Sequence, residues 1–263
     1  MFYLRLISNY MRASAQNEMA YRANFLISLL NSLLGLLTGV LGVAVLFGQV
    51  ETINGWDMAS TFAILGVYLT VGALRNLFIG PSLEALAGMD GEVWTGKLDF
   101  TLLRPVDVQF QASFRHWRPL VLIDLALGVV VIVLAGWRLG STLKLISLVN
   151  FFLAFGIGLL ILYAMLLIFA GLVFWSPGFL FTWVFDGIFQ MARYPVGVYP
   201  NWIKLVLTWV VPVGVITNIP AQALTGLLPV QLLFTSGGLA VLMILLATAV
   251  FRIGLRRYAS ASS

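Results

Sequence analysis

The chain contains no cysteine, a single histidine (His116) and few charged residues for its 263-residue length. The absence of cysteine excludes disulfides, thiolate catalysis and cysteine-based metal sites. One histidine cannot form the His-rich sites of zinc hydrolases, and it argues against a Ser/His/Asp triad. We therefore predict no catalytic residue and no metal site in this chain.

Charge is scarce as well: 10% of the residues are charged, whereas a soluble domain carries roughly 25%. Hydrophobic residues make up 61% of the chain and the mean hydropathy is +1.01. These values predict an integral membrane protein. The net charge of +5 would suggest nucleic acid as the partner of a soluble protein. In a membrane protein it indicates basic loops gathered on one face, so no nucleic-acid partner is expected.

Long apolar runs predict an all-α fold with six transmembrane helices in one domain, residues 1–263. Residues 177–192 form the short fifth span. Prolines interrupt the stretch that follows, which predicts broken or re-entrant helices over 201–224 within an extracellular-side segment, 193–225. Two full spans in this stretch would instead give seven. The remaining five spans are expected at 23–47, 58–79, 117–136, 143–174 and 230–251.

The basic residues decide between six and seven spans. With six spans and both termini in the cytoplasm, eleven Lys and Arg residues fall on the cytoplasmic side, Arg75 among them, and four fall outside. Residues 1–22 combine apolar and Arg-rich sides, which predicts an amphipathic helix lying in the cytoplasmic interface. Residues 80–116 then form the largest cytoplasmic loop.

This loop contains "GEVWTGKL", which nearly matches a nucleotide-binding loop through Gly91, Gly96 and Lys97. Leu98 replaces the Ser or Thr that would hold magnesium, and no strand is predicted before the motif. The chain is therefore not expected to bind ATP. Pro81 suits the first turn of a short helix, "PSLEALA". The apolar and charged residues that follow it favour docking of a soluble partner, although an ordinary interfacial loop would look similar.

The block "GKLDFTLLRP" and the later "YPVGVYPNWIKLVLTWVVPVGVITNIPAQAL" resemble the permease subunits of ABC type-2 exporters, in the branch of roughly 260-residue uncharacterised or drug-type permeases. The resemblance implies a bacterial inner-membrane protein whose ATP and magnesium are bound by a separate soluble ATPase dimer, with no cofactor on this chain. It also implies a second permease, identical or related, and a coupling helix within Pro81 to Pro105. By position, the expected ATPase contacts are Glu84, Trp94, Lys97, Asp99, Arg104 and Pro105.

A carboxylate at the centre of a span is costly, so Asp186 should face protein or water. It could be a structural pairing, or it could line a polar substrate path. The aromatic residues of 193–225 would suit an amphipathic or lipid-like substrate; they are Tyr194, Tyr199, Trp202 and Trp209. Gly35 and Gly39 form a small-xxx-small pattern that could make a dimer contact.

Two other functions remain open on the sequence alone. A membrane-embedded enzyme acting on lipid intermediates would need ionisable groups at one depth. Asp124 and Asp186 lie on different spans without a histidine beside them, which gives this alternative little support. The second alternative is a non-transporting membrane scaffold or immunity protein, which would have no obvious use for broken helices.

Overall fold

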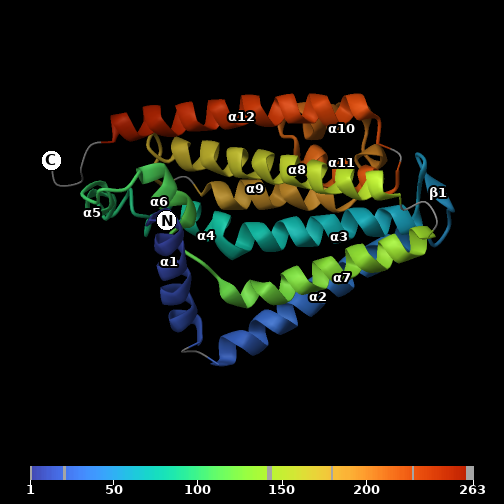
Figure 1. The fold of residues 1–263 in the computed structure, drawn as a ribbon, viewed down its shortest axis with the longest axis horizontal. Helices are drawn as coiled ribbons and strands as arrows, with labels where there is room; N and C mark the ends of the chain where they lie inside the picture. The colour runs from blue at the N-terminus through green and yellow to red at the C-terminus, as the bar shows by residue number, and fades with distance from the viewer. Residues whose placement is uncertain (1, 20–21, 141–143, 179, 227, 259–263) are drawn as a thin grey trace.

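The computed structural model describes residues 2–19, 22–140, 144–178, 180–226 and 228–258, and these residues are predominantly helical. Five long helices run roughly parallel to one another (Figure 1), and a two-residue strand pair connects the first two of them. The all-α membrane fold is therefore confirmed. The long helices are α2 (Arg22–Leu46), α3 (Met58–Leu74), α7 (Leu122–Leu139), α8 (Leu145–Leu172) and α12 (Val230–Arg257), and the strands are β1 (Thr52–Ile53) and β2 (Trp56–Asp57).

Five helical stretches in the described part of the chain are long and apolar enough to cross a bilayer. Each overlaps one of the five long predicted spans, and the second and the last extend beyond their predicted ends: Phe25–Leu46, Met58–Glu84, Pro119–Leu139, Leu145–Leu172 and Val230–Arg257. The broken helices predicted at 201–224 are also present, as Asn201–Val210 and Val213–Leu224, which meet at 91°. They comprise α10 (Asn201–Leu205), the π-helical η6 (Val206–Val210) and α11 (Val213–Leu224).

The predicted fifth span, 177–192, needs correction. Only α9 (Phe181–Gln190) is α-helical there, followed by a 3-10 turn, η4 (Met191–Arg193). Ten residues at 1.5 Å each reach about 15 Å, half of the hydrocarbon core. Prolines before and after α9 limit its length, because a proline cannot continue a helix. Figure 1 shows that α9 starts near the end where α8 stops, and that the bent pair lies toward the end where α12 begins.

The second span also differs from the prediction, because α3 does not stop at residue 79. It continues through a π-helical turn, η1 (Arg75–Ile79), into α4 (Gly80–Glu84), so Pro81 lies inside a continuous helix. Proline has no amide to offer the carbonyl of Leu77 one turn earlier. The backbone amide of Arg118 donates to that carbonyl instead, at 2.8 Å. A contact distant in sequence therefore stabilises the unexpected helix.

Glycines bring the long helices into close contact. A Cβ added at Gly66 of α3 would lie 2.8 Å from the amide nitrogen of Ile132 on α7, and one at Gly128 of α7 would lie 2.7 Å from that of Thr70 on α3. In α8, Gly171 approaches the backbone of α12 in the same way. Small residues allow such approaches between helices in a membrane, where apolar burial contributes little to their association.

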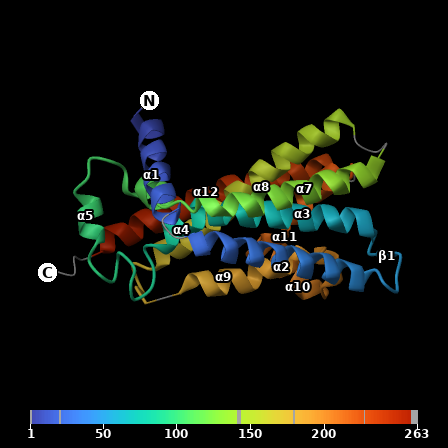
Figure 2. The same cartoon turned by 90° about the horizontal axis from the view of Figure 1, so that it is seen from below.

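The first helix and the C-terminal end of α12 lie at the same end of the bundle (Figures 1 and 2). This first helix, α1 (Phe2–Met19), runs crosswise to the spans. Its position in the membrane interface stays a prediction. α1 is fastened to the start of the third span: the Ser14 hydroxyl accepts from the amide of Trp117 at 3.2 Å, and the Glu18 carboxylate accepts from that of Leu120 at 2.9 Å. The short elements α5 (Leu98–Leu102), α6 (Val108–Phe114) and η2 (Pro119–Val121) lie near this end, and η5 (Val196–Val198) precedes α10.

Candidate functional site: a polar cavity between the helices

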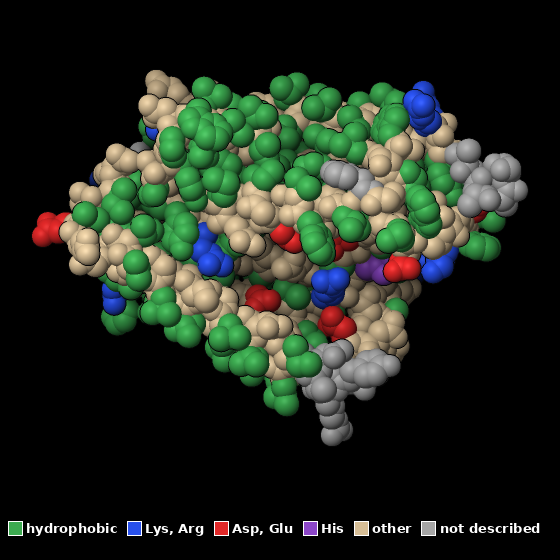
Figure 3. Space-filling model, turned by 180° about the vertical axis from the view of Figure 1, so that it is seen from behind, with side chains coloured by type: hydrophobic (Ala, Val, Ile, Leu, Met, Phe, Trp, Pro, Cys, Tyr) green, Lys and Arg blue, Asp and Glu red, His purple; other side chains and the backbone are tan. Residues whose placement is uncertain are grey.

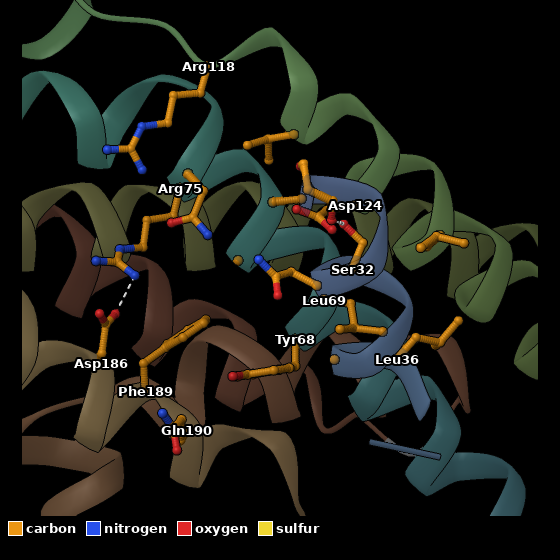
Figure 4. A pocket seen from close by; sticks show the side chains of 18 of the residues that line it. Ser32, Leu36, Tyr68, Leu69, Arg75, Arg118, Asp124, Asp186, Phe189 and Gln190 are labelled. Atoms are coloured by element: carbon orange, nitrogen blue, oxygen red, sulfur yellow. Dashed lines mark hydrogen bonds and ion pairs between the residues drawn. The ribbon is translucent and has the colours of Figure 1, made fainter. Parts of the chain in front are cut away.

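A cavity of about 550 Å³ lies between α2, α3, α9 and the start of α7. Figure 3 shows acidic and basic side chains gathered in a hollow of an otherwise largely uncharged face. In Figure 4, side chains from all four elements surround this space. The charged residues lining it are Arg75, Glu84, Arg118, Asp124, Asp186 and Arg193.

Arg75 is the central charge of the cavity and is only 6% exposed. Its guanidinium donates to the Glu84 carboxylate at 2.9 Å and forms a second ion pair with Asp186. It also lies 4.9 Å from the ring centroid of Phe185. A buried charge is tolerated when it is paired in this way, and loss of a partner leaves the remaining charge uncompensated.

The remaining charged groups are held differently. The guanidinium of Arg193 lies 5.2 Å from the ring centroid of Tyr68, which in turn stacks on Phe189 at 4.9 Å. Within the described residues, neither Arg118 nor Asp124 has an ion-pair partner. Three guanidinium groups and three carboxylates therefore line one cavity, and two of these six groups remain available to a ligand.

The segment after α4 forms a compact element at the end of the bundle. Leu86, Val93 and Leu98 are almost fully buried, and the Glu92 carboxylate accepts from the Arg115 guanidinium at 2.7 Å. Gly88 adopts φ +82°, a left-handed conformation that glycine allows without strain. Residues 91–97 form a series of turns rather than a loop between a strand and a helix.

Large apolar side chains cover the outside of this element: Leu103 is 82% exposed, Met89 73% and Phe100 70%. Among the predicted ATPase contacts, Trp94, Lys97, Arg104 and Pro105 are exposed on the same element. Asp99 is half-buried near the end of α12, where burial and the Asp99 carboxylate raise the pKa of Tyr258. Glu84 lies apart from these residues, because it turns inward to Arg75.

Residues 33–262 match the family described as ABC-2 family transporter protein, which is most of the chain. The chain belongs to the ABC-2 transporter family. This ABC-2 permease is thus a membrane component of a transporter and not itself a catalyst, which decides against the embedded-enzyme alternative. Family membership also implies a partner ABC ATPase. Comparisons with curated proteins and with solved structures gave no match.

Of the predicted substrate-path residues in the permease, Asp186 lines the polar cavity and the four aromatic residues do not. Tyr194 packs its hydroxyl against Gly42 of α2, and the Tyr199 hydroxyl donates to the carbonyl of Met191 at 2.9 Å. Trp202 and Trp209 are 70% and 54% exposed on α10 and η6. These aromatics therefore do not form one site with Asp186.

The two glycines predicted to make a dimer contact do not share one open face. A Cβ on Gly39 would meet the side chain of Leu65, so this glycine serves a contact between α2 and α3 of the same chain. Gly35 has no such neighbour within 4 Å and lines the polar cavity. A role of either glycine between two permeases stays a prediction.

Arg75 is the central residue that the sequence analysis missed. It was counted among the cytoplasmic charges, although it falls inside the predicted span 58–79. A charged residue inside a span is by default a candidate functional residue with a buried partner, and that signal could have identified it. The pairing with Asp186 was not readable, because 111 positions separate the two residues.

Proposed function

We propose that this permease is the membrane subunit of an ATP-driven ABC exporter that moves an amphipathic or lipid-like substrate out of the cytoplasm or the inner leaflet. The observation that carries the proposal is the charged cavity beside α2, a long apolar helix most of which is not buried by the rest of the chain. A polar headgroup would enter the cavity while the apolar part of the same molecule stays between the helices.

ATP and magnesium would be bound by a soluble ATPase dimer that docks on the element formed by residues 85–107. Its exposed apolar side chains support this, since a docking interface needs an apolar core with polar groups around it. Trp94, Lys97 and Arg104 would make the contact, with Asp99 and Pro105 at its border. A second permease, an identical copy or a related one, would complete the path.

Movement of the docking element would reach the spans by two connections. Glu84 ends the continuous second span and holds Arg75, which in turn holds Asp186 of α9. On the other side, the Gln109 amide of α6 contacts the Tyr163 hydroxyl at 3.3 Å and that of Thr248 at 3.4 Å. These bonds join α6 to α8 and α12. A shift of the docking element would therefore reach α8 and α12 as well as the second span and α9.

The bacterial inner membrane, with both termini in the cytoplasm, fits this arrangement. α1, the docking element and the C-terminal end of α12 lie at one end of the bundle. Arg252, Arg256 and Arg257 lie at that end of α12, as the positive-inside rule requires of a cytoplasmic side.

The test is reconstitution of the permease with its ATPase in liposomes, measuring ATP hydrolysis and the export of a fluorescent phospholipid. Arg104→Ala and Asp99→Ala should leave the complex assembled and hydrolysing ATP, while ATP-driven export falls at least about tenfold. Arg138→Ala, an exposed arginine at the far end of α7, is the matched control and should export normally. Unchanged export by the Arg104 and Asp99 variants would refute the docking assignment.

A further inference from the structure

The charges around the polar cavity balance. Three cations and three anions line it, so the formal charges cancel to zero within one cavity of a membrane protein: Arg75, Arg118 and Arg193, and Glu84, Asp124 and Asp186. A cavity that had to accept an ion of one sign would be expected to carry an excess of the opposite sign, because charge separated from water is costly unless it is compensated.

The charges are also divided between paired and available groups. Arg75 is occupied by Glu84 and Asp186, and the Arg193 guanidinium lies over the Tyr68 ring. Arg118 and Asp124 have no ion-pair partner among the described residues. Figure 4 shows these two side chains separated from each other, with Arg118 near Arg75 and Asp124 near Ser32 of α2. One cation and one anion are therefore free on the same wall of the cavity.

We infer that the cavity binds a zwitterionic group, one that carries a positive and a negative charge on neighbouring atoms. The inference rests on the proposed function of the cavity as the substrate path. The anionic part of the ligand would contact Arg118 and its cationic part Asp124. The bound cavity would then remain neutral. A volume of about 550 Å³ suits a headgroup-sized ligand, since small-molecule sites span roughly 300–1,000 Å³.

The test uses the absence of cysteine from the chain. Ser32→Cys places a single thiol in the cavity, and ligand binding slows its alkylation by a maleimide. The full-length protein in maltoside micelles is titrated with single-chain amphiphiles: lysophosphatidylcholine (zwitterionic), lysophosphatidic acid (anionic) and an alkyltrimethylammonium (cationic). A cysteine at Thr235, exposed on α12 and outside this cavity, controls for nonspecific effects of the added amphiphile.

The zwitterionic lysophosphatidylcholine should slow alkylation of the thiol in the Ser32→Cys protein at a concentration about tenfold lower than the anionic or the cationic amphiphile needs. Arg118→Gln leaves the cavity with one excess negative charge and should shift the preference to the cation. Asp124→Asn should shift it to the anion. Arg138→Gln, at the far end of the helix that carries Asp124 and outside the cavity, should keep the preference of the unsubstituted protein. The inference would be overturned if the anion or the cation protected the thiol best without these substitutions. It would also be overturned if both variants shifted the preference in the same direction.

Glycerophosphocholine, which has no acyl chain, identifies the source of the ligand. Equal protection by this compound would indicate that the ligand is a water-soluble zwitterion. Protection by the lysolipid alone would indicate that the ligand is an amphiphile. Both results agree with the inference. Transport separates it from the proposed function. ATP-driven export of an anionic amphiphile with no zwitterion protection would keep the exporter and refute the inference. Protection by the zwitterion without any ATP-driven export would keep the inference and refute the proposed exporter.

Discussion

Replacing Arg75 by methionine removes the cation that pairs with Glu84 and Asp186 and leaves two carboxylates near each other inside the bundle. Breaking a buried ion pair by removal of one partner costs about 3–5 kcal/mol. The Asp186 side chain is 41% exposed and the Glu84 side chain 23%, so solvent screens part of this cost. We therefore expect the lower limit, about 3 kcal/mol of the free energy of unfolding.

The assay is thermal unfolding of the purified permease in maltoside micelles, followed by tryptophan fluorescence. For a chain of this size, about 3 kcal/mol corresponds to a fall in Tm of roughly 6–12 °C. The triple variant Arg75→Met, Glu84→Gln, Asp186→Asn removes all three charges together and should recover most of the loss, because a neutral replacement avoids uncompensated charge. A single variant as stable as the unsubstituted protein, or a triple variant as unstable as the single one, would refute the reasoning.

Two further predictions concern packing and pH. Gly128→Ala should lower the free energy of unfolding by about 1–3 kcal/mol, because its Cβ would meet the backbone of α3. Gly156 has no neighbour within 4 Å, so Gly156→Ala should cause no measurable loss. Unfolding of the two variants under identical conditions checks the difference. Burial, together with Arg115 and Arg118, lowers the pKa of His116, despite the opposing effect of Glu92. The unfolded chain then takes up the proton first as the pH falls below about 6.5, so the stability gained from a neutral histidine is present above that pH and lost on acidification. His116→Asn should show a smaller fall in Tm between pH 7.5 and 5.5, and an unchanged fall would contradict this assignment.

Hydropathy was sufficient to locate the long spans, because a run of apolar residues is a local property of the chain. The second span illustrates this: it was expected to begin at residue 58, and α3 begins at Met58. Asp57 caps it by accepting from the amide of Ser60 at 2.9 Å. The broken helices were also predictable, since Pro212 interrupts the helix wherever the surrounding chain lies.

Features that depend on contacts between distant segments were not predictable. The helix through Pro81 needs the amide of Arg118 to satisfy Leu77, and nothing local to "IGPSLE" reveals that partner. Hydropathy also says little about the rotation of a uniformly apolar helix about its axis. For that reason the sequence could not show that Glu84 turns toward Arg75 or that Gly39 lies against Leu65 of the same chain.

The crosswise helix α1 has a consequence for where the cavity opens. Ser14 and Glu18 hold the amides of Trp117 and Leu120, the two positions that enclose Arg118 and Pro119. An amphipathic helix lies at a defined level, between the headgroups and the acyl chains. With α1 in the interface, as predicted, these two hydrogen bonds would hold Arg118 at that level. The entrance of the cavity would then lie at the headgroups of the leaflet from which the substrate loads.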